Sequence, residues 1–302
     1  MHRAFRTPFL RLSLFFVIIG ALGIVQFAAY QPVQADSTYF QLCSGSTPNT
    51  FSQAWTDIGL IIANDSWSGV GSIEGYRGDN ITASTGVDPQ TLLGGDDGAP
   101  VLDVNANQTD PRAFTTGGAT EFHLTDPTVA LAGSGTADAP YLRLYLNSTG
   151  VTGLTVAYRV RDLEGPGATG TSDNAIQQAA LHWRSGTSGN FTNVAAAYIA
   201  DATTGPDLNA SDTNVSVSLP AGALGQAQLQ LRIMTTNAGG NDEWIGIDDI
   251  VITPTCAAPA DEAPTATVDL AEGATNVPLI STFTYTFSEA VTIDWLSSAV
   301  SL

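Results

Sequence analysis

Apolar residues recur at every second position through most of the chain, and this period constrains its fold more than any other feature. In "LTVAYRVRDL", residues 154–163, apolar residues alternate with Thr and Arg, and the segments "NVSVSLP" and "QLQLRIMTT" repeat the pattern. Such alternation places successive side chains on opposite faces of a β-strand, whereas a helix needs a period of 3.6. Clusters of Gly, Asn, Asp and Thr separate the segments and supply turns. We therefore expect half-buried antiparallel strands.

Other segments carry the same signal, and together they predict the fold class. They are "TYFQLC", "GSIEGYRG", "PVLDVNA", "TEFHLT", "PYLRLYLN", "AALHWRSG" and residues 240–256. Roughly ten short strands with hardly any helical period predict an all-β fold, a jelly-roll-like two-sheet sandwich. We expect this domain to span residues 36–256.

The first 35 residues have the pattern of an export signal. Three arginines precede an apolar run, residues 12–29, and the small-x-small pattern Val33-Gln34-Ala35 closes the segment. A signal peptide over residues 1–35 and a secreted or cell-surface protein follow. An uncleaved anchor is the alternative, because a run of about eighteen apolar residues approaches the length that spans a bilayer. After cleavage we expect no membrane association.

The charge of the chain restricts its partners. Three of the ten basic residues lie within residues 1–35 and all 29 acidic residues lie after residue 35, so that the remainder has a net charge of −22. Such a surface repels nucleic-acid backbones and anionic lipids, and we expect no nucleic-acid binding. It suits either solubility or the binding of Ca²⁺ by oxygen ligands.

The two cysteines, Cys43 and Cys256, lie near the two ends of the predicted sandwich. An even number of cysteines in an exported chain indicates a disulfide, with free thiols as the alternative. The bond would join the first strand of the domain to its last.

A second, shorter β unit follows. "AAPADEAPT" reads as a linker, and we place it at residues 257–264. From residue 265 to 302, "GATNVPL" and "FTYTFSEAV" resemble the opening strands of the SbsA-type bacterial Ig-like domain, of which the chain would hold about the first third. Since an Ig-like sandwich takes about 100 residues, we expect an incomplete Ig-like unit here.

The main domain resembles the N-terminal β module that precedes the catalytic domain in large secreted bacterial nucleases and metallophosphoesterases. The motifs "FSQAWTDIGLIIANDSWSGVGSIEGYRGD", "TGVDPQTLLG", "LDVNANQT", "GSGTADAPYL", "WRSGTSGNFTNV", "ADATTGP" and "NDEWIGIDDI" carry the resemblance. The closing "GIDDIVITPTC" is also similar to the last strand of MAM-type jelly rolls, which supports the pairing of the two cysteines. The resemblance implies an accessory module, with phosphoester chemistry in a domain beyond this chain.

The sequence contains few of the residue patterns that indicate a catalytic site. After the signal, the histidines are His123 and His182, each in a predicted strand and without an acid at a triad spacing. Paired acids are common, at 96 and 97, 162 and 164, 242 and 243, and 248 and 249, but their spacing does not fix the separation that a glycosidase requires. We therefore expect no enzymatic activity.

Three acids are candidate Ca²⁺ ligands. Asp103 opens "DVNANQ", which matches positions 1, 3 and 5 of an EF-hand loop but has Gln108 where Gly is needed. The neighbouring acids Asp248 and Asp249 lie in a strand whose residues alternate, so that one of them should face the core. A buried carboxylate needs a partner. The candidates are Arg159 or Arg161, loop N–H groups, or a bound Ca²⁺ ion.

The expected function is that of a non-catalytic accessory module for adhesion, spacing or substrate presentation. The partner would be an extracellular glycan, surface or protein. A Ca²⁺-assisted carbohydrate-binding module is the alternative, because jelly rolls with several tryptophans can stack sugars. We expect the rings of Trp55, Trp67, Trp183 and Trp244 to lie in the core, since buried aromatic residues dominate core packing.

Overall fold

The computed structural model describes residues 38–94, 100–163, 175–203, 212–259, 265–268, 275 and 285–287. The chain divides into two compact units, residues 1–256 and 257–302. The predicted signal segment, residues 1–35, lies outside the described residues. A search of the described part of the chain for a helix able to cross a membrane finds none.

Two sheets make up most of the first unit, and we name each after the strand in it that pairs with three others. In the described residues the β9 sheet has the order β1-β9-β14-β11-β12, with β5 also paired to β9. Its strands are β1 (Phe40–Gln41), β5 (Ile73–Tyr76), β9 (Tyr141–Asn147), β11 (Ala179–Ser185), β12 (Thr192–Asn193) and β14 (Leu229–Thr235). A separate hairpin joins β2 (Cys43–Ser44) to β3 (Thr47–Pro48).

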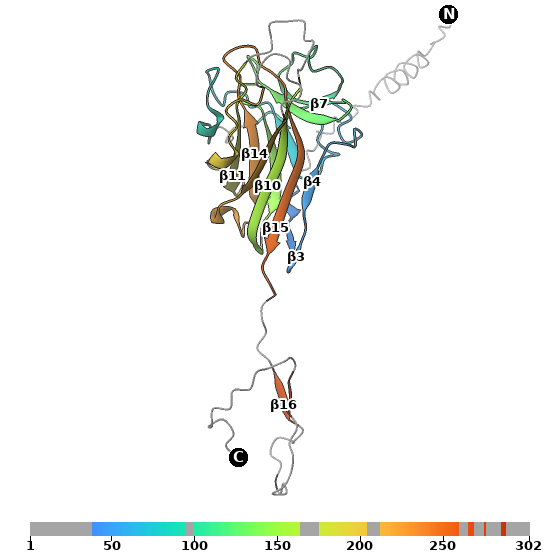
Figure 1. Ribbon diagram of the computed structural model, residues 1–302, viewed down its shortest axis with the longest axis vertical. Coiled ribbons are helices and arrows are strands. Elements are labelled where there is room, and N and C mark those ends of the chain that lie inside the picture. Colours follow the sequence, from blue (N-terminus) through green and yellow to red (C-terminus); the bar gives the residue numbers. More distant parts are fainter. Residues whose placement is uncertain are drawn as a thin grey trace, which may run out of the picture. The chain divides into compact units, whose positions relative to one another are not determined.

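The β15 sheet has the order β13-β10-β15-β8-β7-β6, and β4 also pairs with β15. Figure 1 shows β10 beside β15, with which it pairs antiparallel. Its strands are β4 (Phe51–Gln53), β6 (Asn105–Gln108), β7 (Gly118–Phe122), β8 (Thr128–Ala132), β10 (Val151–Asp162), β13 (Asp212–Ser218) and β15 (Ile245–Cys256). Three short 3₁₀ turns complete the elements: η1 (Pro89–Thr91), η2 (Ala195–Ala197) and η3 (Ala221–Ala223).

The apolar faces of the two sheets meet in one core. Leu142 and Leu144 of β9 belong to the same buried cluster as Val156 and Val160 of β10. These residues occupy alternate positions, as the period of two in the sequence requires. The predicted all-β, two-sheet sandwich is therefore confirmed.

The β9 sheet differs from the prediction on its outer face. Gln230 and Arg232 of β14 were expected to face solvent from a half-buried strand, yet they are 2% and 0% exposed. Arg232 is covered by residues 77–94, whose carbonyls at Leu92 and Gly94 accept its hydrogen bonds. Gln230 instead bonds to Tyr39, with its Nε2 donating to the hydroxyl oxygen at 2.9 Å. The prediction of a half-buried strand is wrong for β14, because alternation shows which residues are apolar but not what covers the polar face.

The second unit is described only in part. β16 (Ala266–Val268) pairs antiparallel with β17 (Tyr285–Phe287), with Thr267 opposite Thr286. The expected Ig-like unit spans residues 265–302, and all of it except residues 265–268, 275 and 285–287 lies outside the described residues. Residues 260–264 of the expected linker lie outside them as well.

Candidate functional site

A β-bulge determines where the two neighbouring acids of β15 point. Arg159 of β10 lies opposite Asp248, whereas Ala157 lies opposite Val251, so β15 has one extra residue here. Asp249 adopts a φ of 48°, in the left-handed region. The bulge lies where β15 changes partner, from β8 at residues 245–247 to β4 at residues 250–252.

The bulge corrects the expectation that one of these acids faces the core. The core side of β15 is occupied by Ile245 and Ile247 before the bulge and by Ile250 and Ile252 after it. Because the extra residue interrupts the alternation, Asp248 bonds instead to arginines on the outer face of β10.

Asp248 is fully buried among these charged partners. Its Oδ2 lies 2.8 Å from Nη1 of Arg161 and 3.2 Å from Nη2 of Arg159. Its Oδ1 accepts the backbone N–H of Asp249 at 2.8 Å. Burial raises the pKa of Asp248, against the opposing effects of the Asp249 N–H and Arg161. The expected arginine partners are thus the ones observed, and Asp126 and Asp212 extend the network.

Asp103 lies in a different environment, between β5 and β6. Its Oδ2 accepts the backbone N–H of Ala119 at 2.6 Å, and burial raises its pKa to about 6. Gly118, with a φ of 119°, admits this carboxylate because a Cβ atom there would collide with it. Asn105 also bonds to this strand, through the Ala119 carbonyl at 3.2 Å. The side chains of the EF-hand-like segment therefore connect β6 to β7.

The structure does not combine the three candidate Ca²⁺ ligands. Asp103 bonds to β7, whereas Asp248 and Asp249 bond to arginines of β10. Within the described ranges, no group of three or more His, Cys, Asp or Glu residues could hold a metal ion.

The disulfide joins the beginning and the end of the sandwich. Cys43 in β2 bonds to Cys256 at the end of β15, and their Cα atoms are 5.9 Å apart. The predicted pairing is confirmed.

The two histidines have different partners. His182 in β11 is fully buried, and its Nδ1 lies 3.1 Å from Nε of Arg232. Burial, together with this guanidinium, lowers its pKa to about 3. His123 follows β7, with Nε2 2.9 Å from Oε2 of Glu121, a pairing that the spacing argument missed.

A buried layer of arginines and aromatic rings covers the outer face of the β9 sheet. The guanidinium of Arg143 lies 4.5 Å from the ring centre of Tyr76, and that of Arg232 lies 4.1 Å from the ring centre of Phe191. Both arginines are almost fully buried. Since residues 77–94 cover this layer, we assign it to the fold and not to ligand binding.

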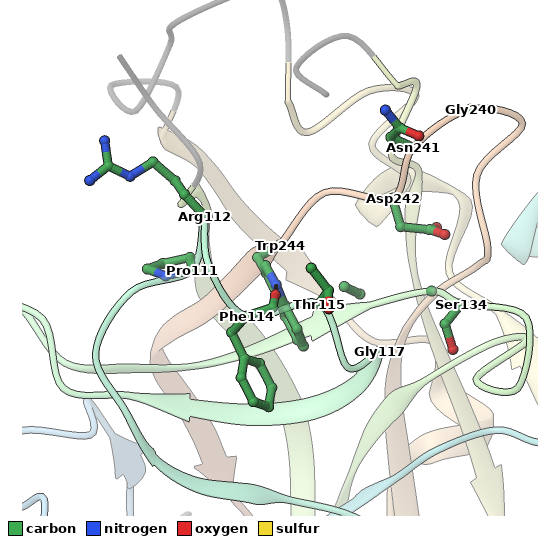
Figure 2. A pocket seen from close by; sticks show the side chains of 12 residues that line it. Pro111, Arg112, Phe114, Thr115, Gly117, Ser134, Gly240, Asn241, Asp242 and Trp244 are labelled. Atoms are coloured by element: carbon green, nitrogen blue, oxygen red, sulfur yellow. Dashed lines mark hydrogen bonds between the residues drawn. The ribbon is translucent and has the colours of Figure 1, made fainter. Parts of the chain in front are cut away.

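An open pocket lies at one end of the sandwich, between three loops (Figure 2). We call it the loop pocket. It has a volume of about 340 Å³, within the usual range for ligand sites. Its walls come from residues 111–117, 132–134 and 240–244, which connect β6 to β7, β8 to β9, and β14 to β15.

Two aromatic rings line the loop pocket. Trp244 is 2% exposed, and its ring packs against Phe122 with centres 5.2 Å apart. Its Nε1 donates to the carbonyl of Phe114 at 2.9 Å, which fixes the orientation of the indole. Phe114 is half-buried, with its ring centre 5.9 Å from that of Trp244. The expectation of core tryptophans holds for Trp55, Trp67 and Trp244, whereas Trp183 is half-buried.

Polar groups occupy opposite sides of these rings. Figure 2 shows Arg112 on one side of Trp244 and Asn241 with Asp242 on the other. Asp242 accepts the backbone N–H of Ala238 at 2.7 Å, and burial raises the pKa of its carboxyl group. Sequence reasoning missed this pocket, because no motif links three loops that are far apart along the chain.

Comparisons with known proteins give little beyond this geometry. Neither the protein-family models nor the curated proteins that were searched give a match to the chain. A cyclase from Fischerella sp. TAU aligns with 70% of this chain and 100% of its own, at 9% identity and a TM-score of 0.37. The K1 cleaved adhesin domain of Lys-gingipain from Porphyromonas gingivalis W83 aligns with 68% of this chain and 97% of its own, at 13% identity and a TM-score of 0.34.

A third solved structure is TmCBM61 in complex with β-1,4-galactotriose. It aligns with 43% of this chain and 72% of its own, at 12% identity and a TM-score of 0.27. At such low identities and TM-scores, these similarities do not assign a function.

Proposed function

We propose that residues 36–256 form a non-catalytic binding module of an extracellular protein, and that the loop pocket holds a saccharide. The observation that carries this proposal is the combination of groups in one open pocket. The half-buried Phe114, packed against the buried ring of Trp244, supplies apolar ring surface, while Arg112, Asn241 and Asp242 supply hydrogen-bonding groups on either side. Saccharides present apolar C–H faces and a rim of hydroxyl groups, which such a pocket can contact together.

The chemistry of the pocket supports binding rather than hydrolysis. Asp242 is the one acidic residue among its described lining residues, which include neither histidine nor cysteine. Glycoside hydrolysis normally uses two carboxyl groups about 5 to 10 Å apart. A single carboxylate can accept hydroxyl groups of a sugar but lacks the second acid of this mechanism.

An extracellular location agrees with the disulfide and with the export signal in the sequence. Disulfides persist in oxidising compartments, and Cys43–Cys256 closes a separation of 213 residues. The resemblance to N-terminal modules of secreted nucleases and metallophosphoesterases further supports an accessory role. In such a protein the module would bind a surface or glycan, and the catalysis would belong to another domain.

Ca²⁺ assistance remains a separate proposal, which chelation can test. The described residues that line the loop pocket include one carboxylate, that of Asp242, whereas a Ca²⁺ ion takes six to eight oxygen ligands. We therefore propose that saccharide binding survives EDTA.

The test is binding of the purified chain to a panel of polysaccharides by affinity electrophoresis, followed by calorimetry. Phe114→Ala should weaken retention by about tenfold, as expected for the loss of one ring contact. Ile62→Ala, which removes an apolar side chain that is 75% exposed elsewhere, is the matched control and should have no effect. Failure to bind any saccharide would reject the binding proposal, and turnover of a saccharide or phosphoester would reject the non-catalytic one.

A further inference from the structure

We infer that the loop pocket selects an acidic saccharide, whose carboxylate pairs with Arg112. This inference rests on the proposed saccharide binding and names the class of ligand. It begins from the different environments of the arginines in the described residues, which are Arg77, Arg112, Arg143, Arg159, Arg161, Arg184 and Arg232.

Six of these arginines are engaged within the fold. Arg159 and Arg161 are held by the carboxylates around Asp248. The Nε of Arg77 donates to Asp79 at 2.7 Å. Three more are at most 6% exposed beneath the cover of the β9 sheet: Arg143, Arg184 and Arg232. All six guanidinium groups therefore have partners within the fold, although the Arg77 side chain is 34% exposed.

Arg112 differs from the others in both exposure and contacts. Its side chain is 43% exposed, and its Nε lies 3.4 Å from Oδ1 of Asp110, which is itself 49% exposed. Among the described residues, no acceptor lies within hydrogen-bond distance of its Nη1 or Nη2. The fork of two N–H groups that pairs best with a carboxylate is therefore open to solvent.

The backbone holds Arg112 at the rim of the pocket while its side chain is free to turn. Asp110 Oδ1 accepts the backbone N–H of Arg112 at 3.1 Å, and the Asp110 carbonyl accepts that of Phe114 at 3.2 Å. Pro111, which lies between them, is buried. This turn places Arg112 and Phe114 on the same loop of the pocket lining, and their side chains leave it in different directions (Figure 2).

The opposite wall suits the hydroxyl groups of the same sugar. Asp242 is held by the Ala238 N–H, and a Cβ atom at Gly133 would collide with its Oδ1, so glycine is required beside it. A fixed carboxylate accepts hydroxyl protons but repels a second carboxylate. A uronic acid can satisfy both walls if its carboxylate turns toward Arg112 and its hydroxyl groups toward Asp242. This short-range pair acts against the long-range repulsion from the net negative charge of the chain, which salt screens.

Calorimetry with two matched oligosaccharides tests the inference. One carries a terminal glucuronate and the other carries glucose in the same position. The wild-type chain should bind the acidic ligand about 10 to 100 times more tightly, as expected for a charge-assisted pair. Arg112→Gln should remove this preference and leave the affinity for the neutral ligand unchanged. Arg112→Lys should restore part of it, because lysine keeps the charge but loses the fork.

The control for net charge is Gln228→Glu. Gln228 is exposed and lies just before the start of β14, whereas the loop that lines the pocket comes after the end of β14. The seven residues of this strand separate its two ends by roughly 20 Å. Like Arg112→Gln it makes the chain more negative by one unit, and it should not change the preference. Equal affinity of the wild-type chain for both ligands, or a preference that persists in Arg112→Gln, would overturn the inference but leave saccharide binding intact. Absence of binding to either ligand would reject both proposals.

Discussion

The Nη1 of Arg161 lies 2.8 Å from Oδ2 of Asp248, a carboxylate that has no exposed surface although it lies on the outer face of its sheet. This contact links β10 to β15 at the β-bulge, beside the second contact from Arg159 at 3.2 Å. Arg161 is thus the closest partner of this buried carboxylate, whereas Arg159 lies closer to Asp126, at 2.7 Å, than to Asp248. The network therefore determines the behaviour of this part of the sandwich.

Arg161→Met should destabilise the fold at pH 7 by about 3 kcal/mol, since it leaves the buried carboxylate of Asp248 without its closest partner. Asp249→Asn, which changes the exposed acid of the same bulge, is the control. The side chain of Asp249 is 55% exposed, and asparagine tolerates its positive φ, so this change should cost less than about 1 kcal/mol. Urea unfolding at pH 7 measures both values. Similar costs for the two variants would contradict the central position of Asp248.

Reduction of the disulfide should lower the free energy of unfolding by up to about 5 kcal/mol, because Cys43 and Cys256 are separated by 213 residues. Cys43→Ser alone and Cys43→Ser with Cys256→Ser should show the same loss, since either change breaks the one bond. Calorimetric melting in the presence and absence of a reductant measures the effect. An unchanged melting temperature after complete reduction would show that packing alone holds these strands together.

Asp103 should make the fold less stable as the pH rises from about 4 to about 6. Burial raises its pKa to about 6 in the folded protein, against about 3.9 in an unfolded chain, so the folded state binds the proton more tightly. Stability is then highest below the unfolded pKa and falls by about 3 kcal/mol as the pH passes the folded pKa.

Asp103→Asn should remove this part of the pH dependence and stabilise the protein at pH 7. Urea midpoints between pH 4 and pH 7 measure it, and Asp110→Asn, at an exposed site, is the control. The carboxyl groups of Asp242 and Asp248 also have raised pKa values, so a smaller slope in the same direction should remain. An identical slope in the wild type and in Asp103→Asn would refute the assignment to Asp103.

Arg232→Met should loosen the segment that covers the β9 sheet. The substitution keeps much of the volume but leaves the carbonyls of Leu92 and Gly94 without their donor, at a cost of about 2 to 4 kcal/mol. Hydrogen exchange of the Gly86 amide, which donates to Asn237 at 2.7 Å, should become faster. Arg112→Met, at an exposed position, should leave this exchange unchanged, and equal protection in both variants would contradict a cover held by Arg232.

The sequence alone predicted the strands and several of their contacts. The alternation in "PYLRLYLN" and "QLQLRIMTT" identified β9 and β14, because a two-residue period is a local property that survives into the fold. The pairing of Cys43 with Cys256 followed from the number of cysteines and an expected oxidising environment. The cost of burying a bare carboxylate was enough to predict a partner for one of Asp248 and Asp249, with an arginine of residues 159–161 as one candidate beside loop N–H groups and Ca²⁺.

Only the tertiary structure decided the remaining features. One extra residue at Asp249 keeps both acids away from the core, and the alternation of the sequence cannot show a bulge that forms where a strand changes partner. The burial of Arg232 depends on residues 77–94, which lie over 130 residues earlier in the chain. The loop pocket likewise combines three loops that carry no shared motif. A sequence pattern reports local preference, whereas burial and sites of this kind arise from contacts between distant segments.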